Sequence, residues 1–377
     1  MPHPYFCTKE KNMFKQPRLI SAVNFDIAKE QQKKELRVYE KLCGFLKLED
    51  LFAVDSVYIC AARCASGFYH KADTQTFMKR PWESAYNLCK QVLSEKFRPT
   101  YYHTHNIIER GKRRTIKPPT FICKVVQKVL CDYLIRPLLE PKMISTSYAS
   151  LTRRGTAKMH EDIVNALNRK IMHDERFTVV LFDYKNYFGS IDIGILMEKL
   201  SRYICDVRIL SLFRSFCPDE AGLSLGNEVS QIPASWFPSE IDHFFKDCLG
   251  MPIFRYMDDS LLVCKQGEEE KIIQIFQRKS EKLHLSCPDE KIHVYHSKES
   301  FAFCKEQFVW DGAGGHYDHL MNQQISQHEM RKILHFEQAD DVPKERAERQ
   351  IRGVLGSIAS HPHSYSAIKK LRSEIRP

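Results

Sequence analysis

The sequence predicts an α+β fold in which helices pack on a mainly antiparallel sheet. Three observations support this prediction. The chain has 377 residues, of which 43% are hydrophobic, and this is enough for a sizeable core and roughly two to three domains. Its 28% of charged residues is typical of a globular protein. From residue 177 onward, apolar segments follow the order strand, helix, paired strands, helix, strand.

Two helices are predicted ahead of the first strand. One begins at Pro81, because proline is tolerated in a first helical turn. A second should begin after Pro119 and end near Pro137, because proline breaks a helix interior. Their apolar faces are formed by Ala85, Leu88, Cys89 and Val92 in the first helix and by Val125, Val126, Val129, Leu130, Tyr133 and Leu134 in the second.

The central strands are predicted by two segments. FTVVLF, residues 177–182, is a run of β-branched and aromatic residues typical of a buried strand, and it ends on Asp183. IFRYMDDSLLVC, residues 253–264, predicts two short strands joined at Met257-Asp258-Asp259. The three aspartates should therefore meet at one edge of the sheet.

Weaker patterns predict the remaining elements. Helices are expected at about 195–203 and 268–283. Short strands are expected at HVYH and at FAFCKEQFVW, followed by a Gly-rich turn at 311–315. The segment 326–377 has a helical and basic pattern.

The composition indicates where the protein is located and what kind of partner it binds. The net charge of +10 suits a polyanionic partner, although many basic proteins bind no nucleic acid. No run of about 18 apolar residues and no apolar signal core is found, so we expect a cytoplasmic protein without membrane contact. The 13 cysteines are expected as free thiols. Cys60, Cys64, His103 and His105 could bind a metal, but they lack a matching second pair at zinc spacing.

Three aspartates are the candidate catalytic residues. Asp258 and Asp259 are adjacent, and two like charges at that distance raise one another's pKa unless a cation lies between them. With Asp183 they provide three hard oxygen ligands, which suit Mg²⁺ or Ca²⁺ and a two-metal phosphoryl transfer. An isolated Asp-Asp pair is more often a solvated turn, so the flanking residues decide between the two interpretations.

These flanks resemble a known family. RYMDDSLLV is similar to the palm hairpin of reverse transcriptases, in which Tyr-x-Asp-Asp is the family mark. FDYKNYFGSID resembles their first palm motif, an aspartate followed five residues later by an aromatic residue, here Phe188. The resemblance implies an RNA-directed DNA polymerase in which Asp183, Asp258 and Asp259 hold two Mg²⁺ ions, which Mn²⁺ can replace. Phe188 would lie under the sugar of the incoming nucleotide and exclude a 2′-hydroxyl.

Further motifs in the right order strengthen the resemblance. SLGNEVSQ (224–231) resembles the template-gripping motif, and CPDEKIHVYH resembles the fourth palm motif. The resemblance places Lys291 near the leaving group, and FAFCKEQFVW occupies the position of the primer grip. Residues expected to contact the template, the primer or the nascent base pair are Gly226, Ser230, Gln231, Tyr256 and Met257.

Two basic segments resemble the fingers motifs of the family. In IIERGKRRTIKPPTF, Lys112 and Arg114 match the Lys-x-Arg pair that meets the incoming triphosphate, where arginine can bind phosphate through two parallel hydrogen bonds. SYASLTRRGT resembles a second basic motif and places Arg153 and Arg154 near the template and primer. For each of these residues a solvated surface position is the alternative.

The resemblance covers about residues 80–320 and implies a right-hand polymerase fold with fingers, a palm with an antiparallel sheet, and a helical thumb. We expect an N-terminal extension over 1–80, fingers over 81–175, a palm over 176–300, and the primer grip and thumb over 301–377. No RNase H, maturase, endonuclease or integrase domain is expected.

The subgroup is less clearly indicated. The chain is most similar to bacterial non-LTR reverse transcriptases of the stand-alone "unknown groups", many of which act in anti-phage defence. It lies near the diversity-generating retroelement enzymes, but Cys123-Lys124 stands where those have Asp-Arg. The implied partners are an RNA template, its DNA product, dNTPs and a cognate non-coding RNA. A second reverse transcriptase, an accessory protein or self-association is also possible.

Two alternatives to the defence role stay open. One is a diversity-generating enzyme, which would be error-prone at template adenines. The other is a catalytically idle RNA-binding scaffold that retains a polymerase fold.

Overall fold

The computed structural model describes residues 45–103, 105–109, 112–116, 118–151, 154–217, 222–224 and 226–321. Residues 322–377 of the predicted primer grip and thumb (301–377) and the first 44 residues of the predicted extension lie outside this part of the chain. Of the described helices, none combines the length and the hydrophobicity that crossing a membrane requires.

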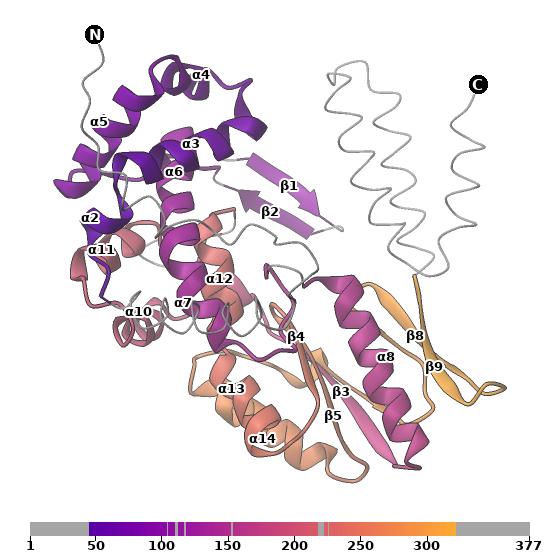
Figure 1. Cartoon of the computed structure of the whole chain (residues 1–377). Helices are drawn as coiled ribbons and strands as arrows, with labels where there is room; N and C mark the ends of the chain where they lie inside the picture. Colours follow the sequence, from indigo (N-terminus) through magenta and orange to yellow (C-terminus); the bar gives the residue numbers. More distant parts are fainter. Residues whose placement is uncertain are drawn as a thin grey trace, which may run out of the picture.

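The N-terminal part of the described chain is helical (Figure 1). Its helices pack through one hydrophobic cluster that includes the predicted apolar face of the Pro81 helix. The prediction for this helix is therefore confirmed, whereas the helices just before it were not predicted. The elements are α2 (Leu48–Leu51), α3 (Val54–Phe68), α4 (Ala72–Lys79), α5 (Pro81–Leu93) and α6 (Phe121–Leu130).

The second predicted helix does not end at Pro137. After α6 the chain makes a π-helical turn (Cys131–Ile135) and continues as α7 (Arg136–Leu139) and a 3-10 turn (Glu140–Lys142). Proline normally clashes with the carbonyl four residues earlier in an α-helix. The wider π turn directly before α7 changes that spacing, so the helix passes through Pro137.

A two-stranded hairpin joins α5 to α6 in sequence. β1 (His105–Glu109) pairs antiparallel with β2 (Lys112–Ile116), and Ile107 lies opposite Arg114. Figure 1 shows this hairpin on the side of the helices that faces α8 (Thr156–Met172). The sequence pattern did not predict these strands.

The central sheet is antiparallel throughout, in the order β4-β5-β3-β6. β3 lies inside the sheet and is buried on both faces, which explains its continuous apolar sequence. The prediction of strands at 177–182 and 253–264 and of a strand at HVYH is confirmed. The strands are β3 (Phe177–Asp183), β4 (Ile253–Tyr256), β5 (Asp259–Lys265) and β6 (Ile292–His296).

Helices cover both faces of this sheet. Val179 and Leu181 of β3 join a cluster with α8 on one face. Phe182 points to the other face and stacks on Phe276 of α14 (Glu269–Glu281), with ring centroids 3.8 Å apart. The remaining helices after β3 are α9 (Tyr187–Ser190), α10 (Ile193–Ser201), α11 (Val207–Ser215), α12 (Glu228–Trp236) and α13 (Ser239–His243). The helices predicted at 195–203 and 268–283 correspond to α10 and α14.

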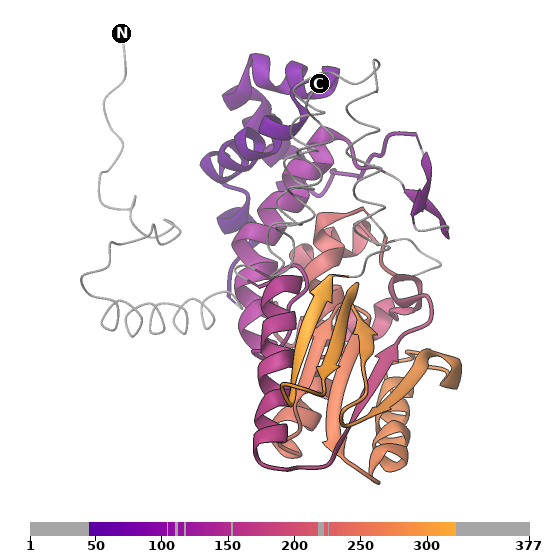
Figure 2. The same ribbon diagram turned by 90° about the vertical axis from the view of Figure 1, so that its right-hand side faces the viewer.

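A third sheet follows, in the order β7-β8-β9. FAFCKEQFVW was predicted as one strand, but it forms a hairpin that turns at Cys304 and Lys305, whose φ angles are +46° and +75°. Figure 2 shows this sheet beside α8, and its aromatic residues join the cluster on that helix. The strands are β7 (Phe301–Phe303), β8 (Glu306–Asp311) and β9 (His316–Met321).

Candidate active site

The three aspartates converge as the sequence predicts. Asp183, the last residue of β3, lies directly opposite Asp259, the first residue of β5. Residues directly opposite in an antiparallel pair have Cβ atoms about 4.5–5.5 Å apart. Asp258 lies in the two-residue turn that joins β4 to β5. Three carboxylates are thereby placed on two neighbouring strands and the turn between β4 and β5.

The turn that carries Asp258 has an unfavourable backbone conformation. The first residue of this turn, Met257, has φ +58°, a backbone angle that residues other than glycine rarely adopt. Met257 packs against the main hydrophobic cluster, and its Sδ lies 3.4 Å from the hydroxyl of Ser235 in α12. Surrounding contacts therefore hold a conformation that costs about 1–3 kcal/mol, as is common at functional sites.

The site concentrates negative charge. Burial, together with the negative charges of Asp258 and Asp183, raises the pKa of Asp259 to about 7. Lys291, on the turn before β6, opposes this charge through an ion pair between its Nζ and Asp183 Oδ2. That hydrogen bond raises the pKa of Lys291. Three carboxylates held together against their mutual repulsion suit a hard divalent cation.

A buried ion pair anchors the strand that leads into the turn. Arg255 of β4 is fully buried and contacts Asp242 of α13, with Nε 3.0 Å and Nη2 2.5 Å from Asp242 Oδ1. The backbone of Arg255 also pairs with the segment around Ser147, which covers the outer edge of β4. Asp242 was not predicted as part of the site, because no spacing or motif in the sequence links it to Arg255.

Phe188 lies on the short helix α9, five residues after Asp183, and is partly buried. Its carbonyl oxygen accepts a hydrogen bond from Leu223 N at 2.7 Å. Gly222 has φ +34°, and a Cβ at this position would lie 2.0 Å from the Phe188 oxygen. The loop at 222–224 therefore packs against the backbone of α9 as closely as only glycine allows.

The residues predicted to grip the template lie at the start of α12. Gly226 is exposed, with φ +93°. Gln231 is partly buried, and its Oε1 lies 3.4 Å from the Ser150 hydroxyl. Ser230 is only 1% exposed, so a direct contact with a template would require it to leave the core.

Helix α6 supports the first turn of α12. The buried Gln127 of α6 accepts a hydrogen bond from Glu228 N at 2.7 Å and donates one to Asn227 Oδ1 at 2.9 Å. Lys128, the next residue of α6, forms an ion pair with the Glu228 carboxylate at 2.8 Å. These contacts position the segment that holds Gly226 and Gln231.

The basic residues predicted for the fingers are only partly described. Lys112 and Arg114 lie on β2, but their side chains are outside the described part, as is the whole of Arg153. Arg154 donates from Nη1 to the carbonyl oxygens of Ile144 and Ser147 at 3.0 and 2.8 Å. Arg154 therefore braces the chain that pairs with β4. Tyr256 lies opposite Asp259 at the end of that strand.

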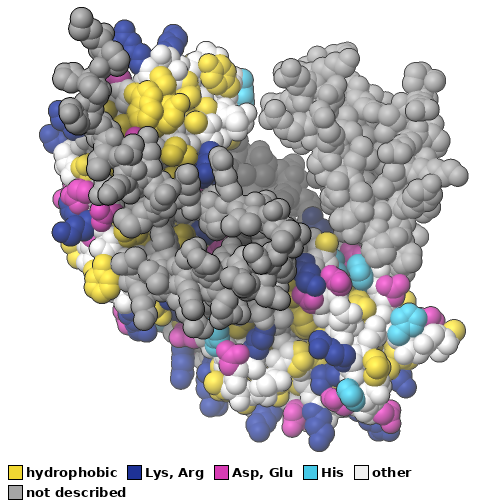
Figure 3. Space-filling model, in the orientation of Figure 1, with side chains coloured by type: hydrophobic (Ala, Val, Ile, Leu, Met, Phe, Trp, Pro, Cys, Tyr) yellow, Lys and Arg dark blue, Asp and Glu magenta, His cyan; other side chains and the backbone are white. Residues whose placement is uncertain are grey.

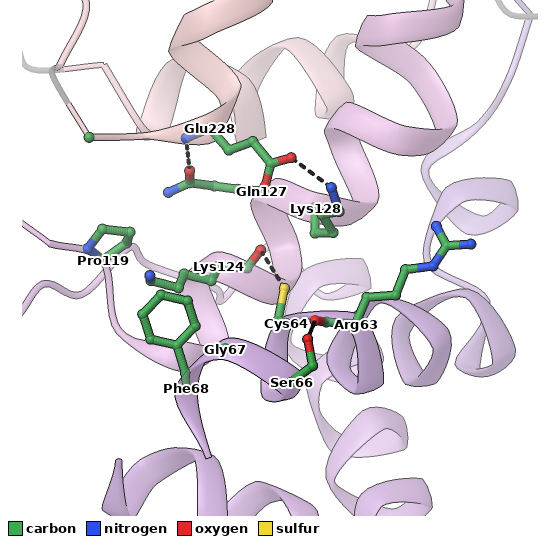
Figure 4. Close-up of a pocket in the computed structure, with 11 residues that line it drawn as sticks. Arg63, Cys64, Ser66, Gly67, Phe68, Pro119, Lys124, Gln127, Lys128 and Glu228 are labelled. Atoms are coloured by element: carbon green, nitrogen blue, oxygen red, sulfur yellow. Dashed lines mark hydrogen bonds and ion pairs between the residues drawn. The ribbon is translucent and has the colours of Figure 1, made fainter. Parts of the chain in front are cut away.

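Figure 4 shows a pocket of about 290 Å³ between α3, α6 and the start of α12. Lys124 Nζ lies 3.2 Å from the ring centroid of Phe68 in this pocket. Cys64 also lines it, and burial raises the pKa of Cys64 to about 11 and that of Cys60 to about 12. Both thiols are therefore protonated at neutral pH when no metal ion is bound.

Three comparisons relate the chain to known proteins. A model of the family described as reverse transcriptase (RNA-dependent DNA polymerase) matches residues 103–310. No curated protein matches the sequence significantly. Among solved structures, the chain is similar to apo telomerase from Candida tropicalis at 12% identity and a TM-score of 0.47, covering 76% of this chain and 64% of that one.

Two other telomerase structures show a comparable likeness. One is the apo enzyme from Candida tropicalis truncated from the C-terminal domain, at 12% identity and a TM-score of 0.45, covering 62% of this chain and 58% of that one. The other is telomerase from Candida albicans in complex with a TWJ fragment of telomeric RNA, at 12% identity and a TM-score of 0.45, covering 72% of this chain and 55% of that one. The chain spans less than two thirds of the length of each.

Proposed function

This chain belongs to the reverse transcriptase (RNA-dependent DNA polymerase) family, and we propose that it copies an RNA template into DNA. Its fold is accordingly of the right-hand polymerase class, with mixed helices and antiparallel sheets. The observation that carries the proposal is the direct pairing of Asp183 with Asp259 across two strands, with Asp258 in the adjoining turn.

The carboxylates fit two Mg²⁺ ions, because three hard oxygen ligands lie together and the pKa of Asp259 is raised by burial and by its anionic neighbours. Bound Mg²⁺ would lower the pKa of the primer 3′-hydroxyl and neutralise charge on the triphosphate. Mn²⁺ would occupy the same ligands. Asp183, Asp258 and Asp259 would hold the ions in place through the two paired strands and the turn that carry them.

Other residues would bind and orient the substrates. Phe188 would lie under the sugar of the dNTP, and Gln231 would contact the template strand. Lys112 and Arg114 would neutralise the triphosphate from β2. Lys291, which contacts Asp183, would move toward the leaving group when the carboxylate takes up a cation. Ser230 and Arg154 have structural contacts, so we assign them to positioning the template motif and β4.

The test is primer extension on an RNA template with dNTPs, comparing wild type with Asp259→Asn and Asp183→Asn. Loss of a metal ligand should remove several kcal/mol of transition-state stabilisation, or roughly a 1,000-fold drop in rate. Asp174→Asn is the matched control, because Asp174 is exposed just before β3, at the end of that strand opposite to Asp183. Equal activity in all four proteins would refute the assigned site. RNA retention without DNA synthesis by the wild type would favour the idle scaffold.

We assign the finer role on sequence resemblance alone. The chain would be a bacterial enzyme of the cytoplasm that copies a dedicated non-coding RNA in anti-phage defence. Sequencing the nucleic acids that co-purify from the native locus would test this role. A discrete non-coding RNA with complementary DNA supports it. DNA copied from a protein-coding repeat, with substitutions at template adenines, would instead indicate a diversity-generating enzyme.

A further inference from the structure

Three residues outside the aspartate site bring metal-binding atoms together. His160 comes from α8, Glu306 from the start of β8 and His319 from β9, and their ligand atoms all lie within 4.8 Å of one another. His319 Nδ1 is 2.9 Å from Glu306 Oε1, and His160 Nδ1 is 3.6 Å from Glu306 Oε2. One carboxylate is therefore faced by two imidazoles, one at each oxygen.

The cluster is buried. His160 is 1% exposed and Glu306 is 0% exposed, and the Phe308 ring lies 5.7 Å from the His160 ring. An ionised carboxylate in such a place is costly unless a positive charge accompanies it. Two neutral imidazoles can each donate one N–H to this carboxylate, but they leave its negative charge uncompensated, whereas a divalent ion would compensate that charge and bind all three side chains at once.

We propose that His160, Glu306 and His319 bind one divalent transition-metal ion of the zinc class. Two imidazole nitrogens and one carboxylate oxygen are ligands that zinc commonly takes, whereas Mg²⁺ prefers oxygen alone. A tetrahedral zinc site places its ligand atoms about 3.3 Å apart, so small side-chain rotations would close the cluster on the ion. Because His160 and Glu306 are buried, the ion would have a structural role.

The position of the cluster determines which parts of the fold the ion would connect. Glu306 follows directly after the turn at Cys304 and Lys305, and Cys304 Sγ lies 3.7 Å from Asp259 Oδ2. The ion would tie this turn, through β8 and β9, to α8, which packs on the central sheet. It would thus hold the hairpin against the aspartates. Metal binding itself does not depend on the proposed polymerase activity.

The test is the metal content of the full chain, purified without a histidine tag from cells supplied with zinc. Inductively coupled plasma mass spectrometry should find about one zinc per chain in wild type. His319→Gln should lose most of this zinc. The matched control is His316→Gln on the same strand, because His316 is exposed, and it should retain wild-type zinc. Asp183→Asn should also retain it, which separates this site from the catalytic carboxylates.

A second measurement covers the case in which His319→Gln does not fold. Cobalt added to metal-free wild type should give visible d–d absorption without a thiolate charge-transfer band, and zinc should displace it. Zinc should also raise the melting temperature of wild type. The proposal is overturned if wild type binds neither metal, if cobalt shows thiolate ligation, or if His319→Gln keeps its zinc. Absence of metal would identify the cluster as a proton-sharing network.

Discussion

At the scale of single residues, Arg255 carries a charge that the fold buries completely, and Asp242 neutralises it. Asp242→Asn keeps the size of the side chain but leaves the guanidinium uncompensated. We expect it to lower the free energy of unfolding by about 3–5 kcal/mol, measured by urea denaturation. Asp247→Asn is the control, because the exposed Asp247 pairs with His243 and its loss should cost under about 1 kcal/mol. Equal losses of unfolding free energy in the two variants would show that the buried pair stabilises the fold no more than the exposed pair does.

Phe188 offers a second residue-scale prediction. Phe188→Ala removes the ring expected under the nucleotide sugar, so space opens for a 2′-hydroxyl. Incorporation of GTP relative to dGTP should rise roughly 10- to 100-fold in a primer-extension assay. Phe244→Ala, which truncates another partly buried aromatic side chain on a different element, should leave the ratio unchanged. An unaltered ratio in Phe188→Ala would remove the residue from the site.

At the scale of elements, the contact between the loop at 222–224 and α9 predicts an effect of Gly222. A Cβ there would lie 2.0 Å from the Phe188 carbonyl oxygen, and the residue has φ +34°. Gly222→Ala should therefore displace α9 and weaken discrimination between dGTP and GTP. Gly250→Ala is the control, because Gly250 has φ +64° but no atom lies within 4 Å of its built Cβ. It should cost about 1 kcal/mol of stability and leave discrimination intact. The same discrimination in both variants would refute the contact.

Elements with local signals were predictable from the sequence. The helix at Pro81 and the strand ending on Asp183 were predicted because one face or both faces are apolar at the required spacing. The turn at Cys304 and Lys305 was missed, because neither residue type marks a turn and only the φ angles reveal it. The hairpin at 105–116 was also missed, because charged residues dominate β2.

Contacts between distant segments were not predictable. His160, Glu306 and His319 come together only because β8 and β9 lie beside α8, and no local spacing relates them. The tie between Arg255 and Asp242 likewise depends on how α13 packs on β4. The aspartate site was predictable, because the motifs of a known family occur in the expected order in this sequence. Those motifs indicate which residues lie together in space.

At the scale of the whole molecule, one hydrophobic cluster runs from Leu48 to Cys287. It joins the N-terminal helices to one face of the central sheet through α6, α12 and α14. The predicted boundary between fingers and palm at residue 175 is therefore not marked by two separate cores, and it stays a prediction. A continuous core favours a rigid relation between α12 and the three aspartates.

The charge of the whole chain carries the last prediction. The net charge is +10, and Figure 3 shows that, among the described residues on this face, Lys and Arg are interspersed with Asp and Glu. If this excess binds nucleic acid, template affinity should fall with salt, because each neutralised phosphate of a single strand adds about −0.7 to the slope of log K against log salt. Fluorescence anisotropy with a labelled RNA measures the slope. Lys112→Gln with Arg114→Gln should make it less steep if these residues contact phosphate. A wild-type slope near zero would mean that the basic excess does not form the binding surface.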